Sequence, residues 1–440
     1  MRAVRIGAAA VAFVIAAACG LAPAPDDDRA APATKATANS SDVVTRSLTD
    51  VERYWKGEFP KLTNGKVFQP VRGGFHPYTK RNLPPDCGGQ SAGYQPNAFY
   101  CPDGDYIAWD AQVLIPQLQE QFGPLLVGVV MAHEYGHAVQ ARLGNTDQPT
   151  VVLEQQADCF AGAWLADVQA GHSAAFKDIT PAQLDNTVAG LLMLRDQPGT
   201  PAVAEGAHGN AFDRIRAFQE GIQQGPRKCA GYDADNLQVT EVPFSTEQEA
   251  ETGGELPYAD AVNLLAQDAE DYWTRTFPQL ADDRPWQPVK VEAFEAGSPP
   301  DCDAPDATAG GAAFYCPAGG YVAFDNSGLG PALYDRIGDF AVGMLLGDLF
   351  ARAAQVQRGE PAADRAGQLA VDCLAGAWTN DLLTRDDQSN QRIRLSPGDL
   401  DEAVAALLAF GRAQKGTGPS AFDRITAYRK GVLEGTGVCG

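Results

Sequence analysis

The chain has 440 residues, of which 45% are apolar, and a formal net charge of −22 at pH 7. This length is enough for two domains of about 180 residues, each with a core of its own. The strongly acidic balance disfavours nucleic acid or an anionic membrane surface as a direct partner of the protein.

The amino terminus carries a predicted export signal. Arg2 and Arg5 precede the apolar run 6–18, which is too short to span a bilayer, and small residues stand directly before Cys19. This pattern resembles a bacterial lipobox, so we predict that residues 1–19 are a signal peptide and that Cys19 is lipidated. The protein would then be anchored to the outer face of the cytoplasmic membrane, with ordinary cleavage and secretion as the alternative. Residues 20–44 have little to bury and are predicted to be a disordered tether.

Residues 45–231 are predicted to form a mainly α-helical α+β domain. The long periodic segments indicate helices at 45–58, 108–121, 123–143, 151–170, 181–195 and 210–224. Two short runs typical of strands, 98–101 and 106–109, flank a turn and predict a small β-hairpin. Its edge is a candidate for pairing with an extended substrate by strand addition, or the hairpin only covers the core.

The run HEYGH at residues 133–137 lies in an apolar part of the predicted helix 123–143. Residues four apart lie one turn above each other on a helix, so His133 and His137 share a face and can bind one metal ion. A catalytic zinc ion takes three protein ligands and an open position for water. Glu134 would be the general base that takes a proton from this water and delivers it to the leaving amine. The alternative is a core helix whose histidines are merely hydrogen-bonded.

The next predicted helix supplies a third ligand. It follows the break 144–149, and a short turn would bring it back antiparallel to the HEYGH helix. Glu154 would then complete a His/His/Glu set for Zn²⁺. Asp158 lies four residues further on the same face, where it can accept the second N–H of a ligating histidine and fix the orientation of its ring.

His208 lies beyond both helices, in a His-Gly turn. The hydrolysis of a peptide bond benefits from a hydrogen-bond donor that stabilises the oxyanion, and His208 is a candidate for this catalytic role. The alternative is an ordinary histidine in a surface loop.

The rest of the chain repeats the first domain. An acidic stretch, residues 232–256, is predicted to be a linker, and residues 257–440 are predicted to be a second copy. The matching segments are Tyr54-Trp55 and Tyr272-Trp273, Pro84-Pro85-Asp86-Cys87 and Pro299-Pro300-Asp301-Cys302, Ala98-Phe99-Tyr100-Cys101 and Ala313-Phe314-Tyr315-Cys316, and Ala211-Phe212-Asp213-Arg214 and Ala421-Phe422-Asp423-Arg424.

The second copy lacks the metal ligands and the base. Alignment of the two copies puts Asp348 in place of His133, Leu349 in place of Glu134, Arg352 in place of His137 and Gln368 in place of Glu154. Arg352 would place a fixed positive charge where a cation should bind. The second copy is therefore predicted to be catalytically inactive and to serve as a docking surface, a lid or an inhibitor, or only as a spacer.

The cysteines follow the same division. Besides Cys19 they form two sets of four at matching positions: Cys87, Cys101, Cys159 and Cys229, then Cys302, Cys316, Cys373 and Cys439. Even sets in an exported protein predict disulfides. The simplest connectivity pairs the first with the second and the third with the fourth cysteine of each set, although each set allows three pairings. A cysteine zinc cluster is disfavoured, because its ligands usually form close pairs in the sequence.

The first copy resembles a known family. The segments HEYGHAVQ and LEQQADCFAGAW, with PPDC and AFYCPDGDYIAWD before them and HGNAFDR after them, are similar to the bacterial putative neutral zinc metallopeptidases over about residues 50 to 230. The resemblance implies a zincin-like domain of the gluzincin type, and by extension two such domains in tandem. It implies His133, His137 and Glu154 as zinc ligands, Glu134 as the base and Asp158 as the partner of a ligand. Peptide-bond hydrolysis is implied without a named substrate.

Two hypotheses on function follow. The first is a membrane-tethered, extracytoplasmic zinc peptidase that acts on peptides or proteins of the cell envelope. The second is a non-catalytic lipoprotein whose two domains form a binding or scaffold module. Glu134 favours the enzyme, because a structural zinc site has no use for a base. The sequence indicates neither the substrate nor the oligomeric state.

Overall fold

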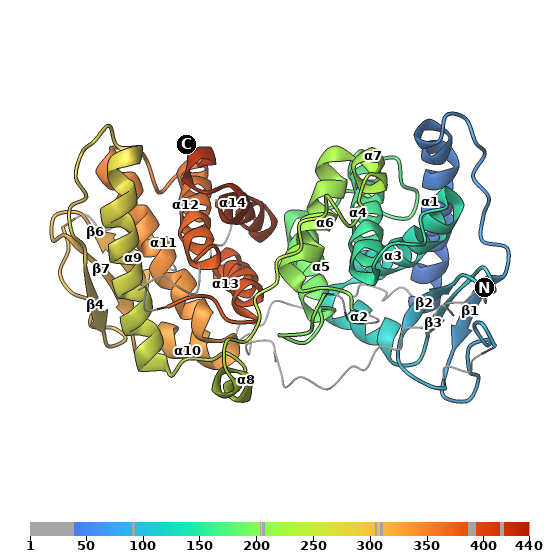
Figure 1. The fold of residues 1–440 in the computed structure, drawn as a ribbon, viewed down its shortest axis with the longest axis horizontal. Helices are drawn as coiled ribbons and strands as arrows, with labels where there is room; N and C mark the ends of the chain where they lie inside the picture. The colour runs from blue at the N-terminus through green and yellow to red at the C-terminus, as the bar shows by residue number, and fades with distance from the viewer. Residues whose placement is uncertain are drawn as a thin grey trace, which may run out of the picture. The chain divides into compact units, whose positions relative to one another are not determined.

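The computed structural model describes residues 39–89, 93–202, 204, 207–303, 306–308, 311–385, 393–413 and 418–439. The chain divides into two compact units (Figure 1). Unit 1 contains the residues up to Arg195, Ala202–Gly209 and Asp213–Val239, and unit 2 contains Asp196–Pro201, Asn210–Phe212 and Thr240–Gly440. The predicted signal peptide, Cys19 and residues 20–38 of the predicted tether lie outside the described residues. In the described part of the chain, no helix has the length and apolar character needed to cross a membrane.

Unit 1 combines helices with a small sheet. Its elements are α1 (Ser40–Leu62), β1 (Gly74–Tyr78), β2 (Ala98–Cys101), β3 (Tyr106–Asp110), α2 (Leu114–Phe122), α3 (Pro124–Leu143), α4 (Thr150–Gln169), α5 (Pro181–Met193), most of α6 (Ala211–Gln224) and α7 (Pro226–Ala230). The fold class predicted from the sequence, a mainly helical α+β chain, is confirmed.

Helix α1 begins at Ser40, before the predicted start of the domain at residue 45. The side chain of Asn39 accepts a hydrogen bond from the backbone N–H of Ser41 and so caps the first turn. Val43 and Val44 are buried. The prediction that residues 40–44 belong to a disordered tether is therefore wrong, because the cap and the two valines extend the amphipathic pattern of α1 toward the amino terminus.

The sheet of unit 1 has the strand order β1-β3-β2. Strand β3 lies between the other two, parallel to β1 and antiparallel to β2. The predicted hairpin of β2 and β3 is present, but β1 has no counterpart among the predicted elements, because its sequence GFHPY contains Gly and Pro. The predicted helix 108–121 starts too early: residues 108–110 complete the fully buried strand β3, and α2 begins at Leu114.

Helices α3 and α4 form the centre of unit 1 (Figure 1). Helix α3 starts at Pro124, whose missing N–H suits a first turn, and ends at Leu143, followed by Gly144 in the left-handed conformation with φ 75°. Most side chains of both helices are buried. Helix α1 covers them, and the ring of Trp55 packs edge-on against Phe160 of α4 with 5.1 Å between the centroids.

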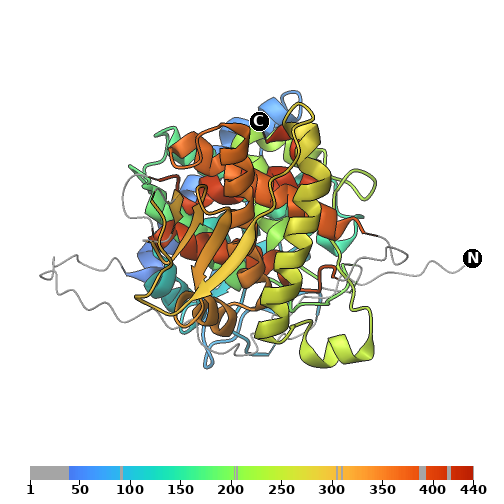
Figure 2. The same cartoon turned by 90° about the vertical axis from the view of Figure 1, so that its left-hand side faces the viewer.

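Unit 2 has a similar succession of elements, with one additional strand and a 3-10 helix in place of the last short α-helix. They are α9 (Tyr258–Leu280), β4 (Lys290–Phe294), β5 (Asp306–Thr308), β6 (Ala313–Cys316), β7 (Tyr321–Asp325), α10 (Leu329–Arg336), α11 (Asp339–Arg358), α12 (Arg365–Leu383), α13 (Asp399–Ala413), α14 (Ala421–Glu434) and a 3-10 helix at Thr436–Val438. The strand order is β4-β7-β6-β5, so β4, β7 and β6 repeat the parallel and antiparallel pairs of β1, β3 and β2. Figure 2 shows this sheet with α9 beside it.

The predicted linker, residues 232–256, contains ordered structure. Tyr232 is buried and donates a hydrogen bond to Glu220 within unit 1. Thr246 caps the short helix α8 (Glu247–Thr252) by accepting the N–H of Glu249. Parts of this stretch therefore belong to the units that it joins, although its acidic composition is typical of a loop.

Matching contacts stabilise the two units. Trp164 Nε1 donates to Asp50 at 3.0 Å in unit 1, and Trp378 Nε1 donates to Asp268 at 2.9 Å in unit 2. Four disulfides follow the simplest of the pairings that the sequence allows: Cys87–Cys101 and Cys159–Cys229 in unit 1, and Cys302–Cys316 and Cys373–Cys439 in unit 2.

Unit 2 contains a cluster of carboxyl groups. Oxygen atoms of Glu255, Asp339 and Glu402 lie within 4.8 Å of one another. Burial, together with the carboxylate of Glu255, raises the pKa of Asp339 to about 6. Burial and the carboxylate of Asp399 raise the pKa of Glu402 well above its usual range. A carboxyl group with a raised pKa holds its proton more tightly in the folded chain, so the cluster favours folding at low pH.

We expect Asp339→Asn to raise the melting temperature at pH 8 but not at pH 4. Because the folded-state pKa of Asp339 exceeds its ordinary value of 3.8, its contribution to stability is complete below about pH 4 and is lost as the pH rises through about 6. The amide keeps an oxygen for the N–H of Leu256, which Asp339 accepts at 2.7 Å. A gain of about 2–4 °C at pH 8 corresponds to about 1 kcal/mol.

Thermal melts of the full chain at both pH values test this expectation. The exposed Asp335→Asn is the control. An equal shift of the melting temperature at pH 4 and pH 8 contradicts the assignment of the effect to the carboxyl cluster.

Candidate metal centre

Helices α3 and α4 place the candidate ligands. His133 and His137 stand one turn apart on α3, and Glu154 stands near the start of α4. Gly136 lets the two helices approach closely, because a Cβ at this position would lie 3.0 Å from the Cα of Ala157. The missing side chain therefore brings Glu154 within reach of both imidazoles.

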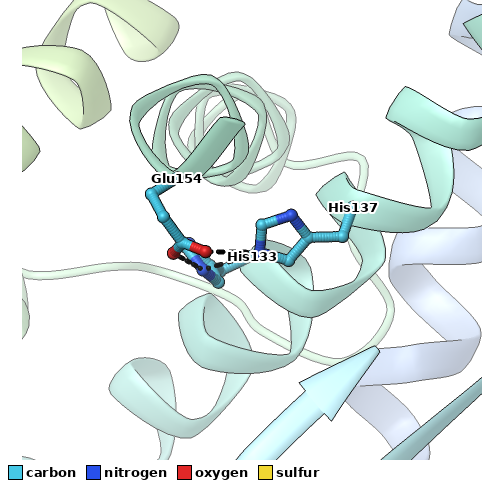
Figure 3. A group of neighbouring side chains, drawn as sticks. All are labelled: His133, His137 and Glu154. Atoms are coloured by element: carbon cyan, nitrogen blue, oxygen red, sulfur yellow. Dashed lines mark hydrogen bonds and ion pairs between the residues drawn. The ribbon is translucent and has the colours of Figure 1, made fainter. Parts of the chain in front are cut away.

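The three side chains point toward one another (Figure 3). The Nε2 atoms of His133 and His137 are 3.3 Å apart. The carboxylate oxygens of Glu154 lie 3.2 Å from Nε2 of His133 and 3.5 Å from Nε2 of His137. Ligand atoms about 2.0–2.1 Å from a tetrahedral zinc ion are roughly 3.3 Å apart. The observed distances agree with this spacing, so the three side chains could hold one metal ion.

Hydrogen bonds hold both imidazoles with Nε2 toward the centre of this group. Nδ1 of His133 donates to Asp158 at 2.8 Å. Nδ1 of His137 donates to the amide oxygen of Gln140 at 2.9 Å, and the amide nitrogen of Gln140 donates in turn to the carbonyl of Leu153. In a neutral ring with the proton on Nδ1, the lone pair of Nε2 faces inward, where it can bind a cation.

Glu154 has an unsatisfied oxygen atom. Its Oε2 is buried, and Nε2 of His133, 3.2 Å away, can donate a hydrogen bond to it only when that ring is protonated on both nitrogens. A buried acceptor without a donor is costly unless a cation binds it. Burial opposes ionisation, but the imidazoles of His137, His208 and His133 hold the pKa of Glu154 below its usual range, so the group stays a carboxylate. Two imidazoles and one carboxylate form a donor set that zinc accepts.

The pKa values of the two histidines agree with a cation site. Burial opposes protonation of His133, but the carboxylates of Asp158 and Glu154 raise its pKa to about 10, so the surroundings of this ring attract positive charge. Burial lowers the pKa of His137, and the neutral imidazole that this favours is the form that binds metals. A metal ion would displace the proton of His133, since ligating histidines are neutral.

Glu134 lies beside this group. Its side chain is 6% exposed and lines a pocket that His133 also lines. Burial raises the pKa of Glu134 to about 8; the positive charge of His133 opposes this shift and the carboxylate of Glu154 adds to it. A carboxylate whose pKa lies near neutrality is suited to exchange protons with a reacting group.

Arg214 of α6 supports the carboxylate that orients His133. Its Nε donates to Oδ2 of Asp158 at 2.8 Å, and its Nη2 donates to Oδ1 at 3.0 Å. Burial opposes ionisation of Asp158, but the Arg214 charge and His133 hold its pKa below the usual range. Arg214 is not among the residues predicted for the site, because the fold alone shows which arginine reaches Asp158. The recurrence of AFDRI at residues 211–215 and 421–425 was the available signal.

His208 lies next to the ligand group. Its Nε2 is 3.9 Å from Oε2 of Glu154, and the residue is 7% exposed. The structure therefore gathers in one place all the residues predicted for the site: His133, Glu134, His137, Glu154, Asp158 and His208.

Ion pairs occupy the equivalent positions in unit 2. Nε of Arg352 lies 2.8 Å from a carboxylate oxygen of Asp348. Nη2 of Arg424 lies 3.2 Å from Asp348 and 2.6 Å from Asp372. The four side chains are buried, and their charges balance. These carboxylates are already paired with guanidinium groups, so a metal ion could bind them only by displacing a buried positive charge.

Known proteins are similar in sequence to the first half of this chain. The sequence model of a family described as "Putative neutral zinc metallopeptidase" matches residues 12–232. The uncharacterised protein Rv2575 of Mycobacterium tuberculosis strain H37Rv is 31% identical over 176 residues, which cover 34% of this chain and 59% of that relative. The uncharacterised protein YpfJ of Escherichia coli strain K12 is 27% identical over 202 residues, which cover 41% of this chain and 68% of that relative.

The chain thus spans less than two thirds of the length of the mycobacterial relative that it matches. The matched region includes both imidazoles, the carboxylate of Glu154 and Glu134, and it ends before Thr240, where the main segment of unit 2 begins. No solved structure matches the chain.

We expect Arg214→Gln to weaken zinc binding roughly 10–100-fold, because loss of the guanidinium leaves Asp158 without the ion pair that holds it against His133. Competition with a chelator of known affinity measures the dissociation constant. The exposed Arg227→Gln is the control. Unchanged zinc affinity in a folded Arg214→Gln protein would show that Asp158 orients His133 without this support.

Proposed function

Because the chain belongs to the family of putative neutral zinc metallopeptidases, we propose that unit 1 is a zinc-dependent peptidase with His133, His137 and Glu154 as the zinc ligands. The observation that carries this proposal is the convergence of two Nε2 atoms on the unsatisfied Oε2 of Glu154. Glu134 distinguishes a catalytic site from a structural one, because a structural zinc ion needs only its ligands.

The residues around the ligands have different roles in the proposed hydrolysis. The zinc ion supplies activation of a water molecule and polarisation of the scissile carbonyl when it is bound. Glu134 takes the proton that the water loses as its oxygen attacks the carbonyl carbon, and then delivers this proton to the leaving amine nitrogen. Its burial raises its proton affinity toward neutral pH, which suits both transfers. Asp158 and Arg214 act as positioning residues, because they reach the reaction only through His133.

We assign His208 the role of a donor to the oxyanion. Its Nε2 lies 3.9 Å from Oε2 of Glu154, so an N–H of this ring would stand next to a substrate carbonyl that approaches the ligand group. Such a donor stabilises the negative charge that develops on the carbonyl oxygen. Strand β2 stands at one end of the described sheet, and its first residue, Ala98, lines the pocket beside Glu134. An extended substrate could pair with β2 at this edge.

We further propose that unit 2 is a non-catalytic copy of unit 1 with a regulatory or structural role. The shared order of elements supports an origin by duplication. The buried ion pairs of Arg352 and Arg424 support the loss of metal binding. Lipidation of Cys19 would anchor the chain to the outer face of the cytoplasmic membrane, with peptides or proteins of the cell envelope as substrates. The four disulfides support a compartment outside the cytoplasm.

Glu134→Gln tests the proposed chemistry. We expect the wild type and the variant each to bind one zinc ion per chain, and the variant to lose peptide cleavage by roughly 10²–10⁴-fold, because the amide cannot take the proton from water. Metal analysis and cleavage of a mixed peptide library measure the two effects, with the exposed Glu120→Gln as the control. Equal cleavage by wild type and variant contradicts the role of Glu134. Zinc binding without cleavage by the wild type would favour a binding module.

His208→Ala tests the oxyanion donor. We expect kcat to fall by roughly 10²–10³-fold with little change in KM, because the donor acts on charge that develops during the reaction. The zinc content should stay the same. His172→Ala is a matched control, since His172 is exposed and bonded to Asp167. A loss of zinc in His208→Ala would instead make His208 a metal ligand, and an unchanged kcat would remove it from the site.

A further inference from the structure

An apolar pocket opens beside the candidate ligands in unit 1. Its aliphatic walls come from three helices: Leu114 and Leu118 of α2, Val129 and Val130 of α3, and Leu191 and Leu194 at the end of α5. Another part of the wall is formed by Pro96 and Asn97, which precede β2, and by Ala98, its first residue. Aliphatic side chains gathered in this way favour an apolar occupant over water.

The pocket is continuous with the reacting groups. His133 and Glu134 are part of its lining. Ala98 places the edge strand β2 at the same pocket, so a substrate backbone that runs along β2 would carry one side chain into it. That side chain would belong to a residue next to the scissile bond, because Glu134 must reach the attacking water.

The size of the pocket sets the size of the occupant. The space in it that is open to a water molecule is about 40 Å³. One water molecule needs roughly 10–15 Å³ on the same measure, so the pocket has room for about three water molecules or a group of similar size. This matches a branched aliphatic group of three or four carbons better than a methyl group, which leaves a gap, or an indole ring, which is too large.

The charges in the wall disfavour a charged occupant. Asp158 and Arg214 line the pocket, but their charged groups bind each other at 2.8 Å. A charged substrate side chain would lose its hydration there and could gain a partner only by breaking this ion pair.

We infer that this pocket is the main specificity site of the enzyme and that it selects a Leu, Ile or Val side chain next to the scissile bond. The inference rests on the proposed function, since it takes the bond beside Glu134 to be the one that is cleaved. In unit 2 the positions of Val130 and Glu134 carry Leu345 and Leu349, which are both buried. Unit 2 thus carries larger apolar side chains at the positions where, in unit 1, the pocket wall meets the proposed general base Glu134.

Direct binding measurements separate this inference from catalysis. The probes are peptide hydroxamates, which attach to a zinc ion and differ in one side chain: hydrogen, methyl, isobutyl, indolylmethyl or carboxymethyl. Calorimetry with the zinc-loaded full chain gives their affinities. We expect the isobutyl compound to bind at least about tenfold more tightly than the methyl compound and the carboxymethyl compound.

Two variants change the pocket in opposite directions. Val130→Phe fills the pocket and should weaken binding of the isobutyl compound by about tenfold or more. The compound with hydrogen in place of a side chain should keep its affinity. Leu191→Ala widens the pocket and should improve binding of the indolylmethyl compound. Met193→Phe is the matched control, because Met193 lies on the same helix as Leu191 but is 45% exposed.

The outcomes distinguish the two proposals. Equal affinities across the series, or tightest binding of the carboxymethyl compound, overturn the pocket inference and leave the zinc site intact. Bound zinc without binding of any hydroxamate also overturns it, because the ion would then be closed to a ligand from the pocket. Absence of bound zinc in the wild type is a failure of the proposed function itself.

Discussion

A carboxylate on α4 faces two imidazoles on α3, and unit 1 is arranged around this contact. Helix burial alone would not place a charged group there, since a buried unpaired charge costs several kcal/mol. Gly136 removes the side chain that would keep the helices apart, and Asp158 with Gln140 turns the rings so that both Nε2 atoms face Glu154. The fold thus brings together two imidazoles and a carboxylate that a bound cation would complete.

Much of this site could be predicted from the sequence, because its geometry is local. His133 and His137 lie one helical turn apart, and so do Glu154 and Asp158, so each pair shares a face whatever surrounds it. Arg214 and the aliphatic pocket depend on contacts between distant segments, and spacing along the chain carries no sign of them. The same limit applies to β1, since parallel pairing with β3 gives GFHPY a structure that its composition does not indicate.

The two units show two ways of balancing charge in one scaffold. Both keep an aspartate bonded to an arginine, Asp158 with Arg214 and Asp372 with Arg424. In unit 1 the remaining carboxylate faces imidazoles, which can exchange a proton for a metal ion. In unit 2 Arg352 brings a permanent charge that no change of pH within the ordinary range removes. The scaffold is therefore compatible with a reactive centre and with an inert one.

The disulfide Cys159–Cys229 stabilises the part of unit 1 that brings the candidate ligands together. Cys159 follows Asp158 directly, and its bond to Cys229 spans a sequence separation of 70 that includes His208 and Arg214. Closing a loop of this size destabilises the unfolded chain by about 4 kcal/mol on entropic grounds. A chain with free thiols lacks this stabilisation when it folds and brings the candidate ligands together. A cation held by this group would thus bind more tightly to the oxidised chain than to a chain with free thiols.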